Sequence, residues 1–209
     1  ETLRYRVSLL NERRDGFVKN VGAGSDLNAL DTKAARVQLW YLPNDYFDLR
    51  LSLHSFKDDS NTAQGVPRGG LVLATLPPLN GLHIKNDPRK IALNGRHSAE
   101  LRFWGGSVEM NAYKGDFTMT SISSYQRMDN THHLDADFTN ATRVQEVISS
   151  EGHQFSQELR LSYGEDSQWS WTLGLFGLYE DLEQNAAIPI EPALLLDYQG
   201  SLENTSVAI

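Results

Sequence analysis

The chain has 209 residues, no cysteine and a formal net charge of −8. This length suits one ordinary domain, and the lack of cysteine excludes a disulfide framework, a Cys-based zinc site and a Cys nucleophile. The acidic balance argues against a general nucleic-acid binder. Mean hydropathy is −0.44 although aromatic residues make up 10%. This combination favours a chain that is apolar on one face only.

No stretch of the sequence approaches the roughly 18 apolar residues of a membrane helix. A membrane location stays open, because a barrel strand needs only about 9–11 residues with alternating lipid-facing and lumen-facing side chains. The first residues lack the basic start and apolar core of a signal peptide, and both ends of the chain fall inside alternating segments. We therefore expect a fragment of a longer protein.

Alternation of apolar and polar residues with a period of two predicts eight strands in chain order. The predicted strands are 3–9, 35–41, 47–54, 97–113, 117–127, 155–163, 169–179 and a last one from about 204. No convincing amphipathic helix is found, and 141–149 is the single candidate for a short one.

The predicted connections alternate strictly in length. The short ones each contain Gly, Pro, Asn or Asp, as tight turns require, and they are 42–45, 114–116 and 164–168. The long ones are about 12–31, 58–96, 128–153 and 180–203. Long irregular loops are uncommon in compact soluble domains. Short turns at one end and long loops at the other are the layout of an outer-membrane barrel.

Aromatic residues flank all three short turns. They are Trp40, Tyr41, Tyr46, Phe47, Tyr113, Phe117, Tyr163, Trp169 and Trp171. Amphipathic rings favour the headgroup level of a bilayer, so this placement predicts a girdle at the periplasmic rim. The alternative is that aromatic residues simply favour strands. Repetition of the placement at every short turn favours the girdle.

A sheet that spans hydrocarbon must close, because every backbone N–H and C=O there needs an internal partner. Eight strands can close a small barrel. The predicted lumen face, however, carries long charged groups that suit a wide, wet or plugged lumen: Arg36, Arg50, Glu109, Glu158 and Arg160. We therefore predict an all-β fold, an antiparallel up-and-down transmembrane β-barrel, of which residues 1–209 form a partial barrel of about seven or eight strands.

Motifs spread in order over nearly the whole chain resemble barrel segments of TonB-dependent receptors. GDFTMTSISSY at 115–125 resembles the family's G-D-F-T-L-T-S-I-T-A-Y hairpin, and QFSQELRL at 154–161 resembles its Q-F-S-Q-E-L-R-L strand. Further similar segments are 11–20, 26–28, 31–36, 133–138 and 171–176, the last matching the W-x-x-G-x-Y-Y/F strand. Each motif alone is moderately specific, and the ordered set is strong.

The resemblance implies a 22-stranded barrel with an N-terminal plug, in the outer membrane of a Gram-negative bacterium. The plug, the N-terminal box that TonB grips and the terminal strand are not in this sequence, so we expect about the first third of a barrel. The implied partners are the TonB complex through those missing parts, the lipid bilayer and a small-molecule ligand. A ferric siderophore is the default ligand, with cobalamin, carbohydrates and other metals as alternatives, and no cofactor is expected.

Four residues of the predicted loop 128–153 are candidates for ligand binding. They are His132, His133, Asp135 and Asp137. Histidine with carboxylates can bind a transition metal. The competing interpretation is a solvated loop whose aspartates stabilise turns. Contact with the transported ligand is favoured over a metal site, because loops on this side would form the vestibule.

Four arginines lie on predicted strands. They are Arg36, Arg50, Arg102 and Arg160, with the first two on predicted lumen faces. Such groups attract anionic ligands such as a ferric chelate. We favour a structural role, in which they pair with acidic groups of the plug or of neighbouring strands.

Nothing in the sequence indicates catalysis. Loop 58–96 is rich in Gly and Pro but lacks the Gly-Lys-Ser/Thr ending of a phosphate-binding loop, and its apolar run 71–76 is expected to pack inside the loop. No Gly-x-Ser-x-Gly elbow is present. The hypothesis is a transport protein and not an enzyme. Its rivals are a passive porin-like barrel, which would lack an upstream plug, and a soluble β-sandwich carbohydrate-binding module, which would not need detergent.

Overall fold

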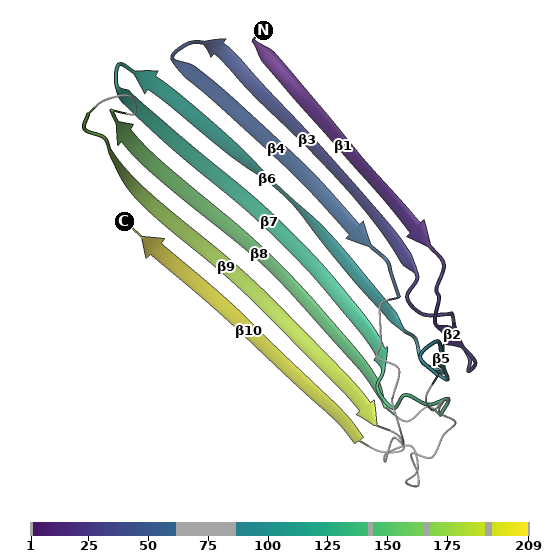
Figure 1. Ribbon diagram of the computed structural model, residues 1–209. Helices are drawn as coiled ribbons and strands as arrows, with labels where there is room; N and C mark the ends of the chain where they lie inside the picture. The colour runs from purple at the N-terminus through teal and green to yellow at the C-terminus, as the bar shows by residue number, and fades with distance from the viewer. Residues whose placement is uncertain (1, 62–86, 142–143, 165–167, 191–193, 209) are drawn as a thin grey trace.

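The computed structural model describes residues 2–61, 87–141, 144–164, 168–190 and 194–208. They form one eight-stranded antiparallel sheet with the order β1-β3-β4-β6-β7-β8-β9-β10 (Figure 1). Its strands are β1 (Leu3–Arg14), β3 (Leu30–Asn44), β4 (Phe47–Asp58), β6 (Ser98–Lys114), β7 (Phe117–Asp135), β8 (Gln145–Tyr163), β9 (Trp171–Ile190) and β10 (Leu194–Ala208).

The sheet is open, with β1 and β10 as its edges, and it matches the predicted partial barrel in class and topology. Each long strand pairs with the next one along the chain, which is the up-and-down arrangement. Two short segments, β2 (Lys19–Asn20) and β5 (Lys90–Ile91), form a separate parallel pair. The described residues contain no α-helix, and hence none that is long and apolar enough to cross a membrane.

The strand ends that border the three predicted short turns all lie at one end of the sheet (Figure 1). Asp45 and Tyr46 join β3 to β4, and Gly115 and Asp116 join β6 to β7. Gly115 has a φ of 58°, in the left-handed region that glycine enters without a Cβ penalty. The third predicted turn connects the end of β8 to the start of β9, and its residues 165–167 lie outside the described residues. The prediction that the tight turns share one rim is confirmed for the two described turns.

The opposite end of the sheet has longer strands than the sequence predicts. β7 continues to Asp135 and β8 begins at Gln145, so the predicted loop 128–153 is only 136–144. The candidate helix at 141–149 is wrong for the same reason, since most of that segment belongs to β8.

The predicted loop 180–203 is also mostly strand, because β9 runs to Ile190 and β10 starts at Leu194. The strict alternation of short and long connections is therefore wrong. The extensions of β7 and β8 carry polar residues on both faces, as in the adjacent register pairs Gln126–Gln154 and Arg127–His153. The period-two signal disappears there, although the backbone ladder continues.

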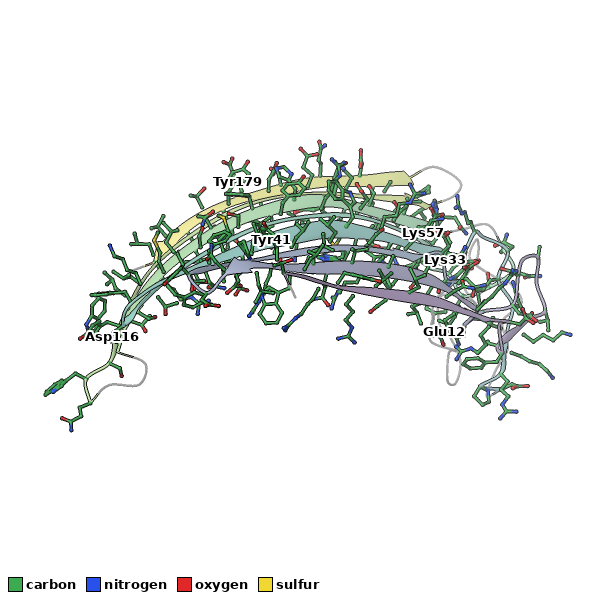
Figure 2. All side chains as sticks on the ribbon, turned by 90° about the horizontal axis from the view of Figure 1, so that it is seen from above. Glu12, Lys33, Tyr41, Lys57, Asp116 and Tyr179 are labelled. Carbon is green, nitrogen blue, oxygen red and sulfur yellow. The ribbon has the colours of Figure 1, made fainter. Side chains whose placement is uncertain are left out.

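Strand alternation and pairing register assign every strand residue to one of two faces. One register row reads Leu3, Tyr41, Leu49, Met110, Ser121, Leu159 and Leu175. We call this side the aliphatic face. In the described part of the chain no second layer covers it, and Leu9 is 79% and Leu173 57% exposed. The sheet curves into an arch, with Tyr179 of this face on the convex side (Figure 2).

The other side is the polar face. Register places all five charged residues predicted for a lumen on it: Arg36, Arg50, Glu109, Glu158 and Arg160. The expectation that one face gathers the charged groups and the other the aliphatic groups is confirmed for these positions.

Two aromatic rows cross the aliphatic face. Near the turns, Phe117, Tyr163 and Trp171 are register partners, and the rings of Phe117 and Tyr163 are 4.9 Å apart. The second row, which the sequence analysis missed, is Tyr125, Phe155 and Tyr179. On β7 the rows enclose the nine residues from Phe117 to Tyr125.

Two aromatic residues predicted for the girdle lie on the other side. Trp40 and Tyr113 point to the polar face, because each is one position out of step with the aliphatic rows. Both instead donate hydrogen bonds to Asp48. Nearness to a turn in sequence does not determine which face a side chain occupies.

The buried apolar core lies in the connections at the loop end rather than in the sheet. Val18, Leu27, Ile91 and Leu93 are at most 3% exposed, and Phe138 packs against them. We call this cluster the loop cap. It joins three connections that are far apart in sequence, so it holds the loop end of β1, β4 and β7 together. The predicted packing of 71–76 lies outside the described residues.

Candidate functional site

The polar face has a hydrogen-bonded network near the short turns, centred on Asp48. This carboxylate is 5% exposed and accepts hydrogen bonds from Trp40 Nε1 at 3.1 Å and Tyr113 OH at 2.6 Å. Asn111 Nδ2 donates a third bond at 3.3 Å. The network connects β3, β4 and β6, and it satisfies a buried charge that would otherwise destabilise the fold.

The arginines of this region are paired. Arg50 Nη1 lies 3.3 Å from Glu109 Oε1 on the neighbouring strand. The guanidinium groups of Arg4 and Arg50 lie 4.9 and 4.8 Å from the ring of Trp40. Farther along the sheet, Arg160 Nε is 3.0 Å from Glu158 Oε1. The structural role predicted for Arg50 and Arg160 agrees with these contacts.

The polar face also has an open depression of about 470 Å³ over β1, β3, β4 and β6. Arg6 and Arg36 line it, and among the described residues neither has an ion pair or a side-chain hydrogen bond. Arg36 lies directly opposite His54 in the register. We call this depression the arginine pocket.

The wall of the arginine pocket is partly apolar. His54 stacks on Phe103 with ring centroids 5.1 Å apart, and its Nε2 is buried without a hydrogen-bond partner. Leu10 and Phe56 extend the apolar lining. Two guanidinium groups beside an aromatic surface suit an anionic ligand that has a flat or apolar part.

The two predicted histidines lie in strand β7 rather than in a loop. His132 is opposite Ala99 and His133 opposite Ser98, and successive side chains of a strand point to opposite faces. The loop location predicted for this pair is therefore wrong, and the two rings do not converge. The reason is again the polar extension of β7 past the aliphatic rows.

The two predicted aspartates hold backbone in place. Asp135 is fully buried, and its Oδ2 accepts hydrogen bonds from the N–H groups of Asn94 and Gly95, both at 3.0 Å. Asp137 is 3% exposed and accepts from the N–H of Thr139 at 2.8 Å and of Val144 at 3.0 Å. The structure thus does not bring the four predicted residues together, and ligand binding by them stays a prediction.

Burial changes the titration of two groups at the loop end. Desolvation raises the pKa of Asp135 to about 6, partly offset by the backbone donors of Gly95 and Asn94. Burial also lowers the pKa of His97 below its usual value. No three His, Asp or Glu side chains are grouped to hold a metal ion in the described part of the chain.

Sequence reasoning missed Arg6, His54 and Phe103 as parts of a site. Arg6 and His54 alternate with aliphatic neighbours, which is the signal that could have placed them beside Arg36. Their grouping around one depression depends on the register of β1, β3, β4 and β6, and alternation within one strand does not provide it.

No family model and no curated protein matches the chain. Among solved structures it is similar to the crystal structure of the ferric yersiniabactin uptake receptor FyuA from Yersinia pestis, with a TM-score of 0.71 and 14% sequence identity. The match covers 99% of this chain, which spans 38% of the length of that one. The similarity shows the fold: an antiparallel sheet that corresponds to part of a receptor β-barrel.

Proposed function

We propose that this chain forms part of the wall and vestibule of an outer-membrane receptor that imports a scarce nutrient with energy from TonB. The observation that carries the proposal is the aliphatic face, which crosses neighbouring strands of the sheet and is covered by no second layer of described residues. Monomeric soluble proteins rarely expose contiguous apolar patches larger than a few hundred Å². Lipid is the phase that accepts such a surface.

The dimensions of the aliphatic face suit a bilayer. The stretch between aromatic rows on β8, from Phe155 to Tyr163, has nine residues, and a tilted barrel strand needs about 9–11. Aromatic rows at both borders match the two interfaces. The edges β1 and β10 carry unpaired backbone groups that hydrocarbon does not tolerate, so in a membrane they pair with further strands.

The arginine pocket supports an anionic ligand. Under this proposal its residues face the interior of the barrel, where Arg6 and Arg36 attract a negatively charged chelate. FyuA is described as a ferric yersiniabactin uptake receptor. A ferric siderophore or a similar chelate is therefore the proposed ligand class.

Uptake in a strain that lacks the gene tests the function. We expect loss of growth and of radiolabelled iron uptake on at least one ferric chelate, with restoration by the wild-type gene. Arg6→Gln together with Arg36→Gln should weaken ligand binding, whereas Arg160→Gln, which lies near the turns, serves as the matched control. Unchanged uptake of every chelate in the deletion strain would contradict the proposal.

The two rival functions separate by simple observations. A β-sandwich needs a second sheet on the aliphatic face, and the described residues form none there. A passive barrel would continue to transport after TonB is removed or the proton gradient is collapsed. The proposal expects uptake to stop under either treatment.

A further inference from the structure

A row of apolar residues crosses the polar face from one edge of the sheet to the other. Each member is a direct register partner of the next, and the row reads Leu10, Ala34, Phe56, Phe103, Met128, Gly152, Leu182 and Leu202. We call it the apolar row. It contains no polar side chain, although it lies on the face that gathers the charged groups of the sheet.

Polar rows border the apolar row on both sides. Toward the turns, the next row of this face is Ser8, Arg36, His54, Gly105, Gln126, Gln154, Glu180 and Asn204. Toward the loop end, it is Glu12, Thr32, Asp58, Leu101, Asn130, Ser150, Gln184 and Gly200. Strand spacing gives the apolar row an area of roughly 200 Å². This is far below the roughly 800 Å² that each partner buries in a stable protein–protein interface, so the row suits the apolar part of a small molecule.

Two open depressions of the polar face meet at Phe103. The arginine pocket contains the members of the apolar row from β1, β3, β4 and β6. A second depression, of about 200 Å³, contains the members from β6, β7, β8 and β9. Phe103 lines both. A Cβ atom at Gly152 would lie 3.1 Å from Leu182 Cδ1, so the glycine keeps the second depression open.

The two arginines of the pocket have no acidic neighbour in the register. Gln38 lies opposite Arg6, and Ser8 and His54 lie opposite Arg36. The row that contains Glu12 and Asp58 is four residues farther along the strands than the row of Arg36, which corresponds to about 13 Å.

The acidic groups on this side of the sheet have other partners. Asp58 Oδ1 accepts a hydrogen bond from Thr32 Oγ1 at 3.1 Å, and Glu109 is paired with Arg50. The positive charge of the arginine pocket is therefore not balanced by its register neighbours, and it favours an anion.

One small molecule can contact both the arginines and the aromatic surface. Phe103 is two strands and two residues away from Arg36, which corresponds to about 10 Å across the sheet and about 7 Å along it. The ring of His54 stacks on Phe103 between them. Aromatic rings pair with other rings in stacked or edge-to-face arrangements, so this surface favours an aromatic group over an aliphatic one.

We propose that the arginine pocket and the apolar row together select an anionic chelate that carries an aromatic ring. The charged centre of the chelate lies at Arg6 and Arg36, and its ring lies against Phe103. The inference rests on the proposed function, because it names the class of chelate that the site takes. It assigns the choice between aryl and aryl-free anions to Phe103.

Isothermal titration calorimetry of the purified full protein in detergent, at fixed ionic strength, tests the selection. The probes are two kinetically inert chromium(III) complexes, the tris(catecholate) and the tris(oxalate). They have the same charge and an all-oxygen donor set, and they differ in the aromatic rings. We expect the wild type to bind the catecholate complex about ten-fold more tightly, which is the contribution of about one ring pair.

Two leucine substitutions separate the ring from the fold. Phe103→Leu keeps an apolar side chain and should reduce the preference to about two-fold or less, with unchanged affinity for the oxalate complex. Phe155→Leu removes a ring from the aliphatic face and should leave both affinities at the wild-type value. Arg6→Gln together with Arg36→Gln should weaken both complexes and keep the preference.

Equal affinity of the wild type for the two complexes would overturn the inference, as would a preference that persists in Phe103→Leu. Binding of neither complex, or undiminished binding in the double arginine variant, would overturn it as well. The readout is the affinity for two inert anions rather than uptake of iron. Uptake that is lost in the deletion strain and restored by the gene would then leave the transport proposal standing without this selection.

Discussion

The loop cap and the aliphatic face are both apolar, yet their side chains differ greatly in solvent exposure. In the cap, Leu27 is 1% and Leu93 0% exposed. On the aliphatic face, Tyr5 is 76% and Leu9 79% exposed. The apolar side chains of the cap are thus buried by other residues of this chain, whereas those of the aliphatic face are not. Under the proposed function, the end of the sheet that carries the cap meets water and the aliphatic face meets lipid.

The cap depends on polar contacts as well as on apolar packing. The side chain of Asn20 donates to the carbonyl of Leu93 at 3.2 Å and accepts from its N–H at 2.9 Å, across 73 residues of sequence. Lys19 N–H also donates to the carbonyl of Arg89 at 2.8 Å. These bonds join segments that are far apart in sequence but adjacent in space. The cap should therefore open as a unit.

The largest expected difference between the two regions comes from shortening a leucine in each. Leu27→Ala leaves a cavity in the cap and should cost about 2–5 kcal/mol of its stability. Leu51→Ala on the aliphatic face should cost far less, because in the proposed membrane lipid chains would fill the space. Hydrogen exchange of the paired amides of Val18 and Leu27 measures the first effect. Equal losses at both sites would contradict the contrast.

The second-largest effect is expected from a charge introduced on the aliphatic face. Leu159 lies midway between the aromatic rows on β8, and Arg at the midplane of a barrel strand costs about 2–4 kcal/mol. Leu159→Arg should lower the amount of folded protein in the outer membrane. Glu158→Arg, one residue away on the polar face, is the control and should assemble better. Normal assembly of Leu159→Arg would place this face outside lipid.

The pH dependence of the cap sharpens the comparison further. The folded pKa of Asp135 is raised to about 6 from 3.8, so the closed cap binds a proton more tightly than the open one. Stability of the cap is then highest below pH 4 and falls as the pH rises through 6. Hydrogen exchange of Asn94 and Gly95 should show better protection at pH 5 than at pH 7.5.

Two variants separate charge from hydrogen bonding at Asp135. Asp135→Asn keeps an acceptor oxygen and should flatten the pH dependence. Asp135→Ala leaves the buried N–H groups of Asn94 and Gly95 without this acceptor, at about 1–3 kcal/mol for each unsatisfied donor. An unchanged pH slope in Asp135→Asn would assign the effect to another group.

The smallest effect is expected at a polar patch within the aliphatic face. Gln157 Nε2 donates to Ser121 Oγ at 3.1 Å, and Ser123 donates to Gln157 Oε1. These groups satisfy one another, which explains how they tolerate an apolar surrounding. Gln157→Leu should change folded stability by less than about 1 kcal/mol, because lost hydrogen bonds and gained apolar contact offset each other. Thermal unfolding in detergent measures this change, and a large loss would contradict the expected offset between the hydrogen bonds and the apolar contact.

Much of the sheet follows from local sequence. The alternation around Leu49 and Leu51 and the turn residues Gly115 and Asp116 predict strands and reversals directly. The polar halves of β7 and β8 could not be predicted in this way. In β8 (Gln145–Tyr163), for example, apolar and polar residues alternate only from Phe155 onward. In these halves, hydrogen bonding to the neighbouring strands determines that the segment is a strand, and the sequence of one strand alone does not indicate this pairing.

The candidate site was less predictable than the sheet. Alternation within its strand assigned Arg36 to the predicted lumen face. Its grouping with Arg6 and His54, however, depends on the register of β1, β3 and β4. His132 and His133 do not form a cluster, because adjacent side chains of a strand point to opposite faces, and ligand binding by them stays a prediction. The buried role of Asp135 depends on a contact with Gly95, 40 residues away, which local patterns do not contain.

Single-cysteine labelling tests the central claim that the strands cross a bilayer with the turns and the cap on opposite sides. The chain has no cysteine of its own, so Asp116→Cys at the turn end (Figure 2) and Asn140→Cys at the loop end each introduce the single thiol of residues 1–209. A membrane-impermeant maleimide should label residue 140 in intact cells and residue 116 only after the outer membrane is permeabilised. Equal labelling of both sites in intact cells would contradict the account.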